Sequence, residues 1–173
     1  ISSHSVYGQE HEPLWTEETP VAPATTYAQA KYSTELMTQS LHTINNQVRT
    51  SSLRLSSLSG GQPGLVLDML AKFVNQALTK QDIHIVGGQQ IVDRLDIRDA
   101  VNAAIALIQT NPLDWEPLYN VGTDVQYSIL EIANLVIDRV HQKIGTPKVK
   151  VNLEEKDIRM KFGMNCTKFS KFT

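Results

Sequence analysis

The sequence predicts an α/β fold, because short strand-like segments alternate along the chain with segments of helical periodicity. The clearest helix is expected from residue 26 to about residue 48, where proline and glycine are absent and apolar residues recur at helical spacing. Residues 118–121 are one of several strand candidates. No internal repeat or low-complexity tract breaks this alternation.

Prolines and glycines indicate where the first strands and loops begin and end. Residues 1–8 predict a short strand that runs into a turn, and the prolines within residues 9–25 exclude a helix interior there. Residues 51–57 alternate in character and lead into Gly60, Gly61 and Gly64. This pattern favours a strand that ends in a flexible turn accessible to phosphate.

A helix ending near Lys80 comes next, because apolar residues recur at spacings of three and four. These residues are Val66, Met69, Leu70, Phe73, Val74 and Ala77. Two short strands are expected near residues 83–86 and 91–97, separated by two glycines. Asp99 is expected to cap the helix that follows them.

The last third of the chain carries a strong helix-start signal. Ser128 and Glu131 have the spacing of a capping box, and Gly145 should end the helix that they open. A final strand is expected over residues 149–153, and the chain stops inside an expected helix near Phe169. The sheet built from these strands is expected to be incomplete.

The bulk composition bounds the class of protein. The 173 residues are 41% apolar and 20% charged, which suits a soluble chain with one sizeable core. The formal net charge of −2 gives no general attraction to nucleic acid or to an anionic membrane, so neither partner is expected. The single cysteine, Cys166, cannot form an internal disulfide, and no Cys/His clustering predicts a metal site. A reducing, cytoplasmic setting is expected.

Tyr27 and Lys31 lie one helical turn apart, on the same face of the first predicted helix. A free tyrosine titrates near pH ~10, and a nearby ammonium favours the phenolate and brings it toward the working range of a general base. An exposed helix produces the same spacing by chance. The pair therefore needs support from the segment before it.

Ser2 and Ser3 place hydroxyl groups at the end of the first strand, where open α/β sheets bind ligands. Ser3 is expected to hydrogen-bond the substrate oxygen that Tyr27 protonates or deprotonates. The alternative is a serine-rich strand end that satisfies its own turn.

Several ordered motifs together resemble one family. Ser-Ser-x-x-Val-Tyr-Gly at residues 2–8, followed by Tyr-x-x-x-Lys at residues 27–31, resembles the extended short-chain dehydrogenase/reductases, the NAD-dependent epimerase/dehydratase family. The matching motifs continue at residues 53–60, 88–101, 119–129 and 157–168. The resemblance therefore spans nearly the whole chain.

The resemblance implies a Ser-Tyr-Lys site and a nicotinamide cofactor, NAD or NADP. Ser3 would orient the substrate, Tyr27 would act as general acid/base, and Lys31 would lower the pKa of the phenol and hold the nicotinamide ribose. The implied cofactor contacts are Ser2, Tyr27, Lys31, Leu55 and Ser56. The implied contacts to a sugar or nucleotide-sugar substrate are Ser3, Ser57, Arg94 and Arg159.

The resemblance also implies the architecture, a partial doubly wound, Rossmann-like sheet with a smaller α/β substrate-binding domain. Residues 1–60 would form the C-terminal part of the cofactor domain. Residues 61–173 would form mainly the substrate domain, with some segments returning to the first. The glycine-rich turn that receives the dinucleotide pyrophosphate lies upstream in this family, so we expect this stretch alone to be inactive.

Some positions depart from the family pattern. Val92 and Glu154 fall where arginines are common in the family. Arg94, two residues along the strand from Val92, is a candidate to replace the first of these arginines. The alternative for Arg94, and equally for Arg159, is an ordinary exposed salt bridge.

His4 and Ser5 fall where sugar 4,6-dehydratases usually carry an acid pair. The resemblance therefore favours epimerisation or simple oxidation and reduction over loss of water.

Two functions stay open at this stage. The first is an NAD(P)-dependent epimerase or reductase that acts on a sugar or nucleotide sugar. The second is a non-catalytic binding or assembly module that keeps the fold, a reading favoured by the missing phosphate loop and the replaced arginines.

The assembly state is open as well. The apolar stripes within residues 37–48 and 66–80 either cover the sheet or form a homodimer face, because family members commonly pair through such helices.

Overall fold

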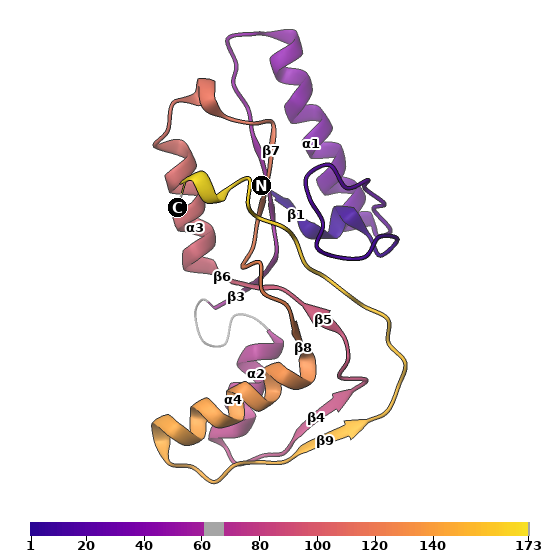
Figure 1. The fold of residues 1–173 in the computed structure, drawn as a ribbon, viewed down its shortest axis with the longest axis vertical. Helices are drawn as coiled ribbons and strands as arrows, with labels where there is room; N and C mark the ends of the chain where they lie inside the picture. Colours follow the sequence, from indigo (N-terminus) through magenta and orange to yellow (C-terminus); the bar gives the residue numbers. More distant parts are fainter. Residues whose placement is uncertain (61–67, 173) are drawn as a thin grey trace. The chain divides into compact units, whose positions relative to one another are not determined.

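A computed structural model describes residues 1–60 and 68–172 and divides the chain into two compact units (Figure 1). Unit 1 contains Ile1–Leu58, Asp93–Val125 and Phe162–Thr173, and unit 2 contains Ser59–Val92 and Gln126–Lys161. Each unit is therefore assembled from segments far apart in sequence. Within the described residues, no helix is both long and apolar enough to cross a membrane.

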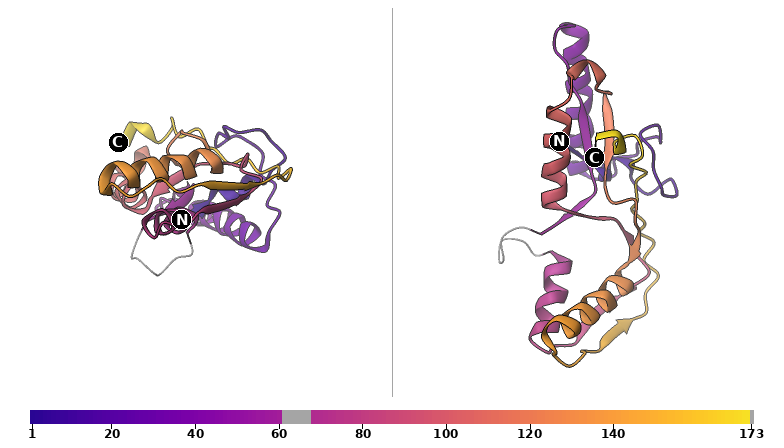
Figure 2. Two further views of the ribbon diagram at one scale, coloured as in Figure 1. Left: turned by 90° about the horizontal axis from the view of Figure 1, so that it is seen from below. Right: turned by 60° about the vertical axis from the view of Figure 1, so that its left-hand side comes forward.

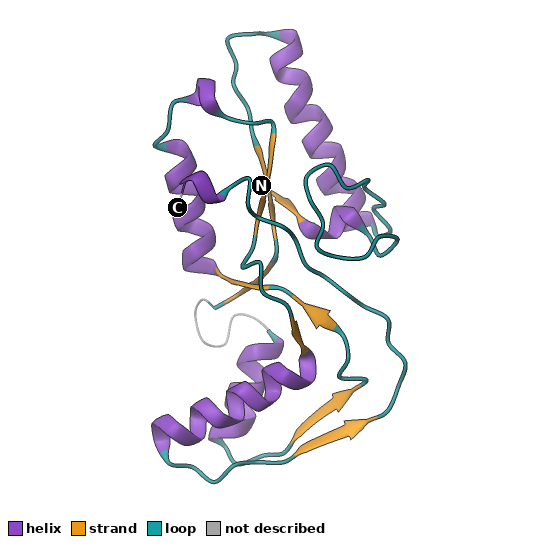
Figure 3. Ribbon diagram, in the orientation of Figure 1, coloured by secondary structure: helices purple, strands orange, loops and turns teal. Residues whose placement is uncertain are grey.

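Unit 1 is built on a parallel sheet of three strands in the order β1 (Ser2–Ser3), β2 (Ser52–Leu55) and β7 (Leu118–Val121). The register pairs Ser3 with Leu55 and Leu55 with Val121, so the carboxyl ends of the three strands lie at one edge. Helices α1 (Thr26–Ile44) and α3 (Ile97–Ile108) lie on opposite sides of this sheet (Figures 1 and 3).

The two faces of this sheet differ in chemistry because side chains alternate along a strand. On the α3 side, Leu53 and Leu55 of β2 join Tyr119 and Val121 of β7 in an apolar core with Leu107 and Phe169. On the opposite face of the same strands, Arg54 and Asn120 are buried. The side of the sheet that meets α1 is therefore polar.

Shorter elements complete unit 1. They are the 3-10 helices η1 (His4–Tyr7), η2 (Pro112–Asp114) and η3 (Ser170–Phe172), and strands β3 (Ser57–Ser59) and β6 (Arg94–Asp96), which pair with each other. A second apolar cluster, made of Val6, Tyr7, Trp15, Met164 and Cys166, packs beneath the loop that precedes α1. This cluster ties the first and last segments of the chain together.

Unit 2 packs α2 (Met69–Leu78) against α4 (Ile129–Ile144), and the two helices lie side by side in every view (Figures 1 and 2). Strands β4 (Ile83–Val86) and β9 (Val151–Glu154) pair in parallel. Strands β5 (Ile91–Val92) and β8 (Tyr127–Ser128) pair antiparallel.

The predicted ends of α4 are confirmed. The Ser128 hydroxyl accepts from the Glu131 backbone N–H at 3.1 Å, and the Glu131 carboxylate accepts from the Ser128 N–H at 2.7 Å. Gly145 ends the helix in the left-handed conformation, at φ 75°, which glycine adopts without a steric penalty.

The α/β class and the parallel sheet are confirmed, and the differences lie at element boundaries. α1 ends at Ile44, short of the predicted residue 48, because Asn45 leaves the helical conformation. The helix cap predicted at Asp99 is wrong: the Asp96 carboxylate accepts from the Arg98 N–H at 2.8 Å, so α3 begins before Asp99. The predicted helix near Phe169 is a 3-10 turn.

Three further predictions differ from the structure or lie outside the described residues. The predicted strand over residues 91–97 is two short strands, and Gly61, Gly64 and Val66 lie outside the described residues. In α1 the apolar stripe does not cover the sheet, since Met37 is 70% exposed and Ile44 is 80% exposed. The buried residues of α1 are Ala28 and Glu35. The homodimer face remains a prediction.

Removing the capping box should weaken unit 2 measurably. Ser128→Ala leaves the Glu131 N–H without its acceptor and should lower the free energy of unfolding by about 1 kcal/mol. Gln142→Ala, at an exposed position of the same helix, is the matched control and should change it by less than about 0.5 kcal/mol. Urea denaturation followed by circular dichroism measures both, and equal stability of the two variants would contradict the assignment.

Candidate active site

The predicted pair Tyr27 and Lys31 lies in the first turns of α1. The Thr25 hydroxyl caps this helix by accepting from the Ala28 N–H at 3.1 Å, which sets the helix start immediately before Tyr27. The Lys31 ammonium lies 5.7 Å from the centroid of the Tyr27 ring and donates to the Ile1 carbonyl at 3.2 Å. The ammonium therefore joins the tyrosine to the strand that carries Ser2 and Ser3.

The environment of these side chains suits a ligand site. Tyr27 is 58% exposed, so the residue is open to solvent. Ser3 caps η1, and its oxygen accepts from the Ser5 N–H at 3.2 Å and from the Ser5 hydroxyl at 3.0 Å. A hydroxyl can donate one hydrogen bond while it accepts two, so Ser3 keeps a donor for a ligand.

Besides Tyr27 and Lys31 on α1, the predicted cofactor contacts lie in or directly after β1 and β2. The Ser2 hydroxyl is buried without a hydrogen-bond partner among the described residues, which marks a polar atom that a ligand would satisfy. Ser56 is buried directly after β2, where its N–H donates to the Val121 carbonyl at 3.0 Å. The Leu55 side chain packs in the apolar core under α3. Leu55 would therefore contact a ligand through its backbone.

His4 and Ser57 form a contact that the sequence did not predict. The His4 Nε2 and the Ser57 Oγ are 3.1 Å apart, and the imidazole packs edge-on against Phe162 with ring centroids 4.7 Å apart. Burial, helped by the positive charge of Arg94, lowers the pKa of His4 to about 4. The imidazole is therefore neutral at pH 7, and one of its nitrogens is engaged by Ser57.

The two arginines proposed to contact substrate lie in different units. Arg94 lies on β6 of unit 1, half-buried and close enough to His4 to influence its pKa. Arg159 lies in unit 2, where its exposed guanidinium forms an ion pair with Asp157 at 3.2 Å. The structure thus brings Arg94, but not Arg159, into the unit that holds Ser3, Tyr27 and Lys31.

The main feature that sequence analysis missed is a buried ion pair beneath α1. Glu35 accepts from Arg54 at 2.9 and 2.7 Å, with both side chains almost fully buried. The Arg54 guanidinium lies 4.6 Å above the ring of Tyr7, a cation-π contact. The sequence shows only that Glu35 follows Lys31 by one further turn, and this spacing does not indicate Arg54 as its partner.

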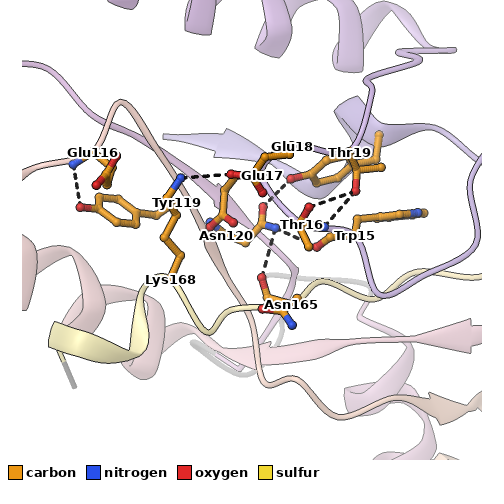
Figure 4. Close-up of polar contacts among 11 residues, drawn as sticks. Trp15, Thr16, Glu17, Glu18, Thr19, Glu116, Tyr119, Asn120, Asn165 and Lys168 are labelled. Carbon is orange, nitrogen blue, oxygen red and sulfur yellow. Dashed lines mark hydrogen bonds and ion pairs between the residues drawn. The ribbon is translucent and has the colours of Figure 1, made fainter.

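The polar chain continues from Tyr7 to Asn120 on β7, an outer strand of the sheet. Burial raises the pKa of Tyr7, so its phenol stays protonated and donates to the Asn120 side chain at 2.7 Å. The Asn120 N–H donates to Glu17 at 2.7 Å, and its side-chain amide donates to the Trp15 carbonyl at 2.9 Å (Figure 4). Asn120 therefore fastens the loop that leads into α1.

Comparison with known families identifies the class of protein. Residues 1–122 match the model of the NAD dependent epimerase/dehydratase family. The chain belongs to this family, as its motifs indicated, and the parallel sheet and the Ser-Tyr-Lys segment both fall within the matched residues.

Individual relatives agree with the family at low identity. Low-salt glycan biosynthesis protein Agl12 of Haloferax volcanii is 24% identical over 141 residues, which are 81% of this chain and 44% of that protein. UDP-glucuronic acid 4-epimerase from Bacillus cereus, solved with NAD, has a TM-score of 0.76 and 25% identity over 99% of this chain and 53% of its own. RMD from Pseudomonas aeruginosa, solved with NADPH, has a TM-score of 0.78 and 23% identity over 100% of this chain and 58% of its own. The chain thus spans about half the length of these relatives.

Acid should destabilise the protein through His4. As pH falls, the unfolded chain binds a proton near pH 6.5, whereas the folded chain binds it near pH 4. The stability linked to His4 is therefore full above pH 6.5 and is lost as pH falls through 4, a change of about 3 kcal/mol.

His4→Gln keeps a partner for Ser57 but removes the titration. Urea unfolding at pH 7.5 and pH 4 should show that the wild type loses about 3 kcal/mol more than this variant. Equal losses in the two proteins would mean that His4 is not shielded in the folded chain.

Proposed function

We propose that the protein is an NAD(P)-dependent epimerase or oxidoreductase that acts on a sugar or nucleotide sugar, with Tyr27 as general acid/base. The observation that carries this proposal is the position of the Lys31 ammonium, which contacts both the Tyr27 ring and the backbone beside Ser2 and Ser3. Family membership of residues 1–122 supports it.

Each residue of the trio has a role that follows from its chemistry. When a sugar alcohol is oxidised, Tyr27 takes the hydroxyl proton, and when the carbonyl is reduced Tyr27 returns it. Lys31 stabilises the negative charge on the phenolic oxygen while Tyr27 lacks its proton. Ser3 donates a hydrogen bond to the same substrate oxygen. The bound nicotinamide supplies the acceptor and donor of hydride.

The residues present fit a nicotinamide cofactor. The buried Ser2 hydroxyl lacks a partner within the described chain and lies at the carboxyl end of the sheet, where dinucleotides bind in open α/β folds. Ser56 directly follows the neighbouring strand β2, and Lys31 has donors left for a ribose hydroxyl. We assign Ser2, Tyr27, Lys31, Ser56 and the Leu55 backbone to this cofactor.

Among the reactions of the family, the site favours epimerisation or simple oxidation and reduction. Elimination of water needs an acid and a base in addition to the tyrosine. Where dehydratases of the family carry an acid pair, this chain has His4 and Ser5 instead. His4 is neutral at pH 7 with a pKa of about 4, so it is a poor proton donor there. The Ser5 hydroxyl is engaged with Ser3.

The substrate is assigned by class. The Bacillus cereus relative is named as an epimerase of UDP-glucuronic acid, a nucleotide sugar. In this chain Ser57 and Arg94 are the proposed substrate contacts of unit 1, and Arg159 is the proposed contact of unit 2. Because the chain spans about half of its relatives, the activity is proposed for the complete protein.

The Tyr27 hydroxyl should be essential for turnover. Tyr27→Phe removes the proton-transfer atom and should lower kcat by about 10²- to 10⁴-fold in the protein expressed from its complete reading frame. Tyr32→Phe is the matched control, since Tyr32 lies on the same helix and packs on the cluster under the loop. Conversion of substrate to product measures both, followed by chromatography for an epimer or by nicotinamide absorbance for a net oxidation or reduction. Wild-type turnover in Tyr27→Phe would refute the assigned role.

The product should retain all of the oxygen atoms of the substrate. With neutral His4 in place of an acid, we expect mass spectrometry to show an epimer, or a product differing by two hydrogen atoms, and no loss of water. Introducing His4→Asp with Ser5→Glu restores an acid pair and is the comparison variant. A dehydrated sugar as the main product of the wild type would overturn this assignment.

A further inference from the structure

Three residues spaced by four define one side of α1. Tyr27, Lys31 and Glu35 follow one another at intervals of four, which turns each about 40° around the helix axis from the one before. Tyr27 is 58% exposed, whereas Glu35 is 2% exposed and faces Arg54 of the sheet. The orientation of Glu35 therefore determines where the same helix presents Tyr27.

Few other contacts of α1 fix its rotation as strictly as the Glu35 carboxylate does. α1 also carries Tyr32, which packs partly buried on the second apolar cluster, and Lys31, which donates to the Ile1 carbonyl. Its buried residues are Ala28 and Glu35, and its large apolar side chains near the C-terminus are exposed. An alanine presents one methyl group and tolerates a small rotation of the helix. A carboxylate bound by two parallel hydrogen bonds does not, because both bonds require one relative orientation.

The partner of Glu35 contacts the other parts of the site as well. Arg54 belongs to β2, two residues before Ser56, and its guanidinium also lies over the ring of Tyr7. Tyr7 ends the η1 helix that Ser3 caps. One arginine thus links the segments that carry the proposed acid/base, the proposed substrate-orienting serine and the proposed cofactor contacts.

We infer that Glu35 and Arg54 are a positioning pair, which aligns the Tyr27 hydroxyl with the Ser3 hydroxyl on one substrate oxygen. This inference rests on the proposed function, because it names what sets the geometry of that site. The pair touches neither substrate nor cofactor. It acts by fixing the rotation of α1 relative to β2 and η1, and a misplacement of about 1 Å at a reacting group can cost about 100-fold in rate.

The test separates positioning from folding. A buried ion pair replaced by apolar residues of similar volume commonly leaves the protein folded, whereas loss of one partner strands a buried charge. Glu35→Leu with Arg54→Met is therefore the variant of choice in the complete protein. Its folded fraction is measured by circular dichroism, and kcat and KM are expressed per folded molecule.

The expected result is a selective loss of kcat. The double variant should show kcat lowered by about 10- to 100-fold and KM changed by less than about 3-fold, since ligand contacts remain while the reacting groups are misaligned. Arg54→Lys keeps the charge but loses the second hydrogen bond, and it should recover part of the rate. Leu107→Ala, in the core on the opposite face of the sheet, should leave kcat per folded molecule unchanged.

A second readout asks whether the pair acts through Ser3. If alignment with Tyr27 is already lost, Ser3→Ala should cost at least about 3-fold less in the double variant than in the wild type. A purely structural pair would leave the cost of Ser3→Ala the same in both backgrounds.

Two outcomes would overturn the inference. One is a folded double variant with wild-type kcat. The other is a double variant that fails to fold together with an Arg54→Lys variant that turns over at the wild-type rate. Tyr27→Phe is measured in parallel: full activity in that variant refutes the proposed function itself, whereas an inactive Tyr27→Phe beside a fully active double variant refutes the positioning role alone.

Discussion

The ion pair between Glu35 and Arg54 is the constraint on which the rest of unit 1 depends. Both side chains are almost fully buried, and neither charge could be left alone there, because removal of one partner of such a pair costs about 3–5 kcal/mol. The requirement to satisfy Arg54 brings α1 onto the sheet through Glu35 and brings Tyr7 beneath the guanidinium. From Tyr7 the same polar chain reaches Asn120 and the loop before α1.

The two faces of the unit 1 sheet therefore have different roles, stability on one and orientation on the other. The α3 face is apolar and its packing is nondirectional, so it supplies stability through burial. The α1 face is polar, and its hydrogen bonds require particular angles as well as particular distances. Tyr27 and Lys31 lie on α1, the helix on this second face, and the chemistry proposed for them depends on the alignment of two hydroxyl groups.

The sequence predicted what is encoded locally. The alternation of elements, the capping box at Ser128, the turn at Gly145 and the helix that carries Tyr27 and Lys31 each depend on neighbouring residues, and the structure contains all of them. The cap was predicted at Asp99 rather than at Asp96 because Asp93, Asp96 and Asp99 lie close together. Their equal preference for the N-cap position does not distinguish them.

The contacts that the sequence did not predict are those made between distant segments. A glutamate in a helix is usually exposed to solvent. No residue near Glu35 in the sequence indicates that its partner is an arginine 19 positions later, on a buried face of a strand. The contact of His4 with Ser57 bridges 53 positions. The apolar residues of α1 near Met37 predicted a covered face by their spacing alone, and in unit 1 they are exposed.

The most direct test of the account is a crystal structure of the complete protein with a nicotinamide cofactor and an unreactive sugar analogue. We expect the Ser3 and Tyr27 hydroxyls both to lie about 3 Å from one oxygen of the sugar, with the Lys31 ammonium at the cofactor ribose. Finding the Tyr27 hydroxyl in solvent, or the two hydroxyls on different parts of the ligand, would contradict it.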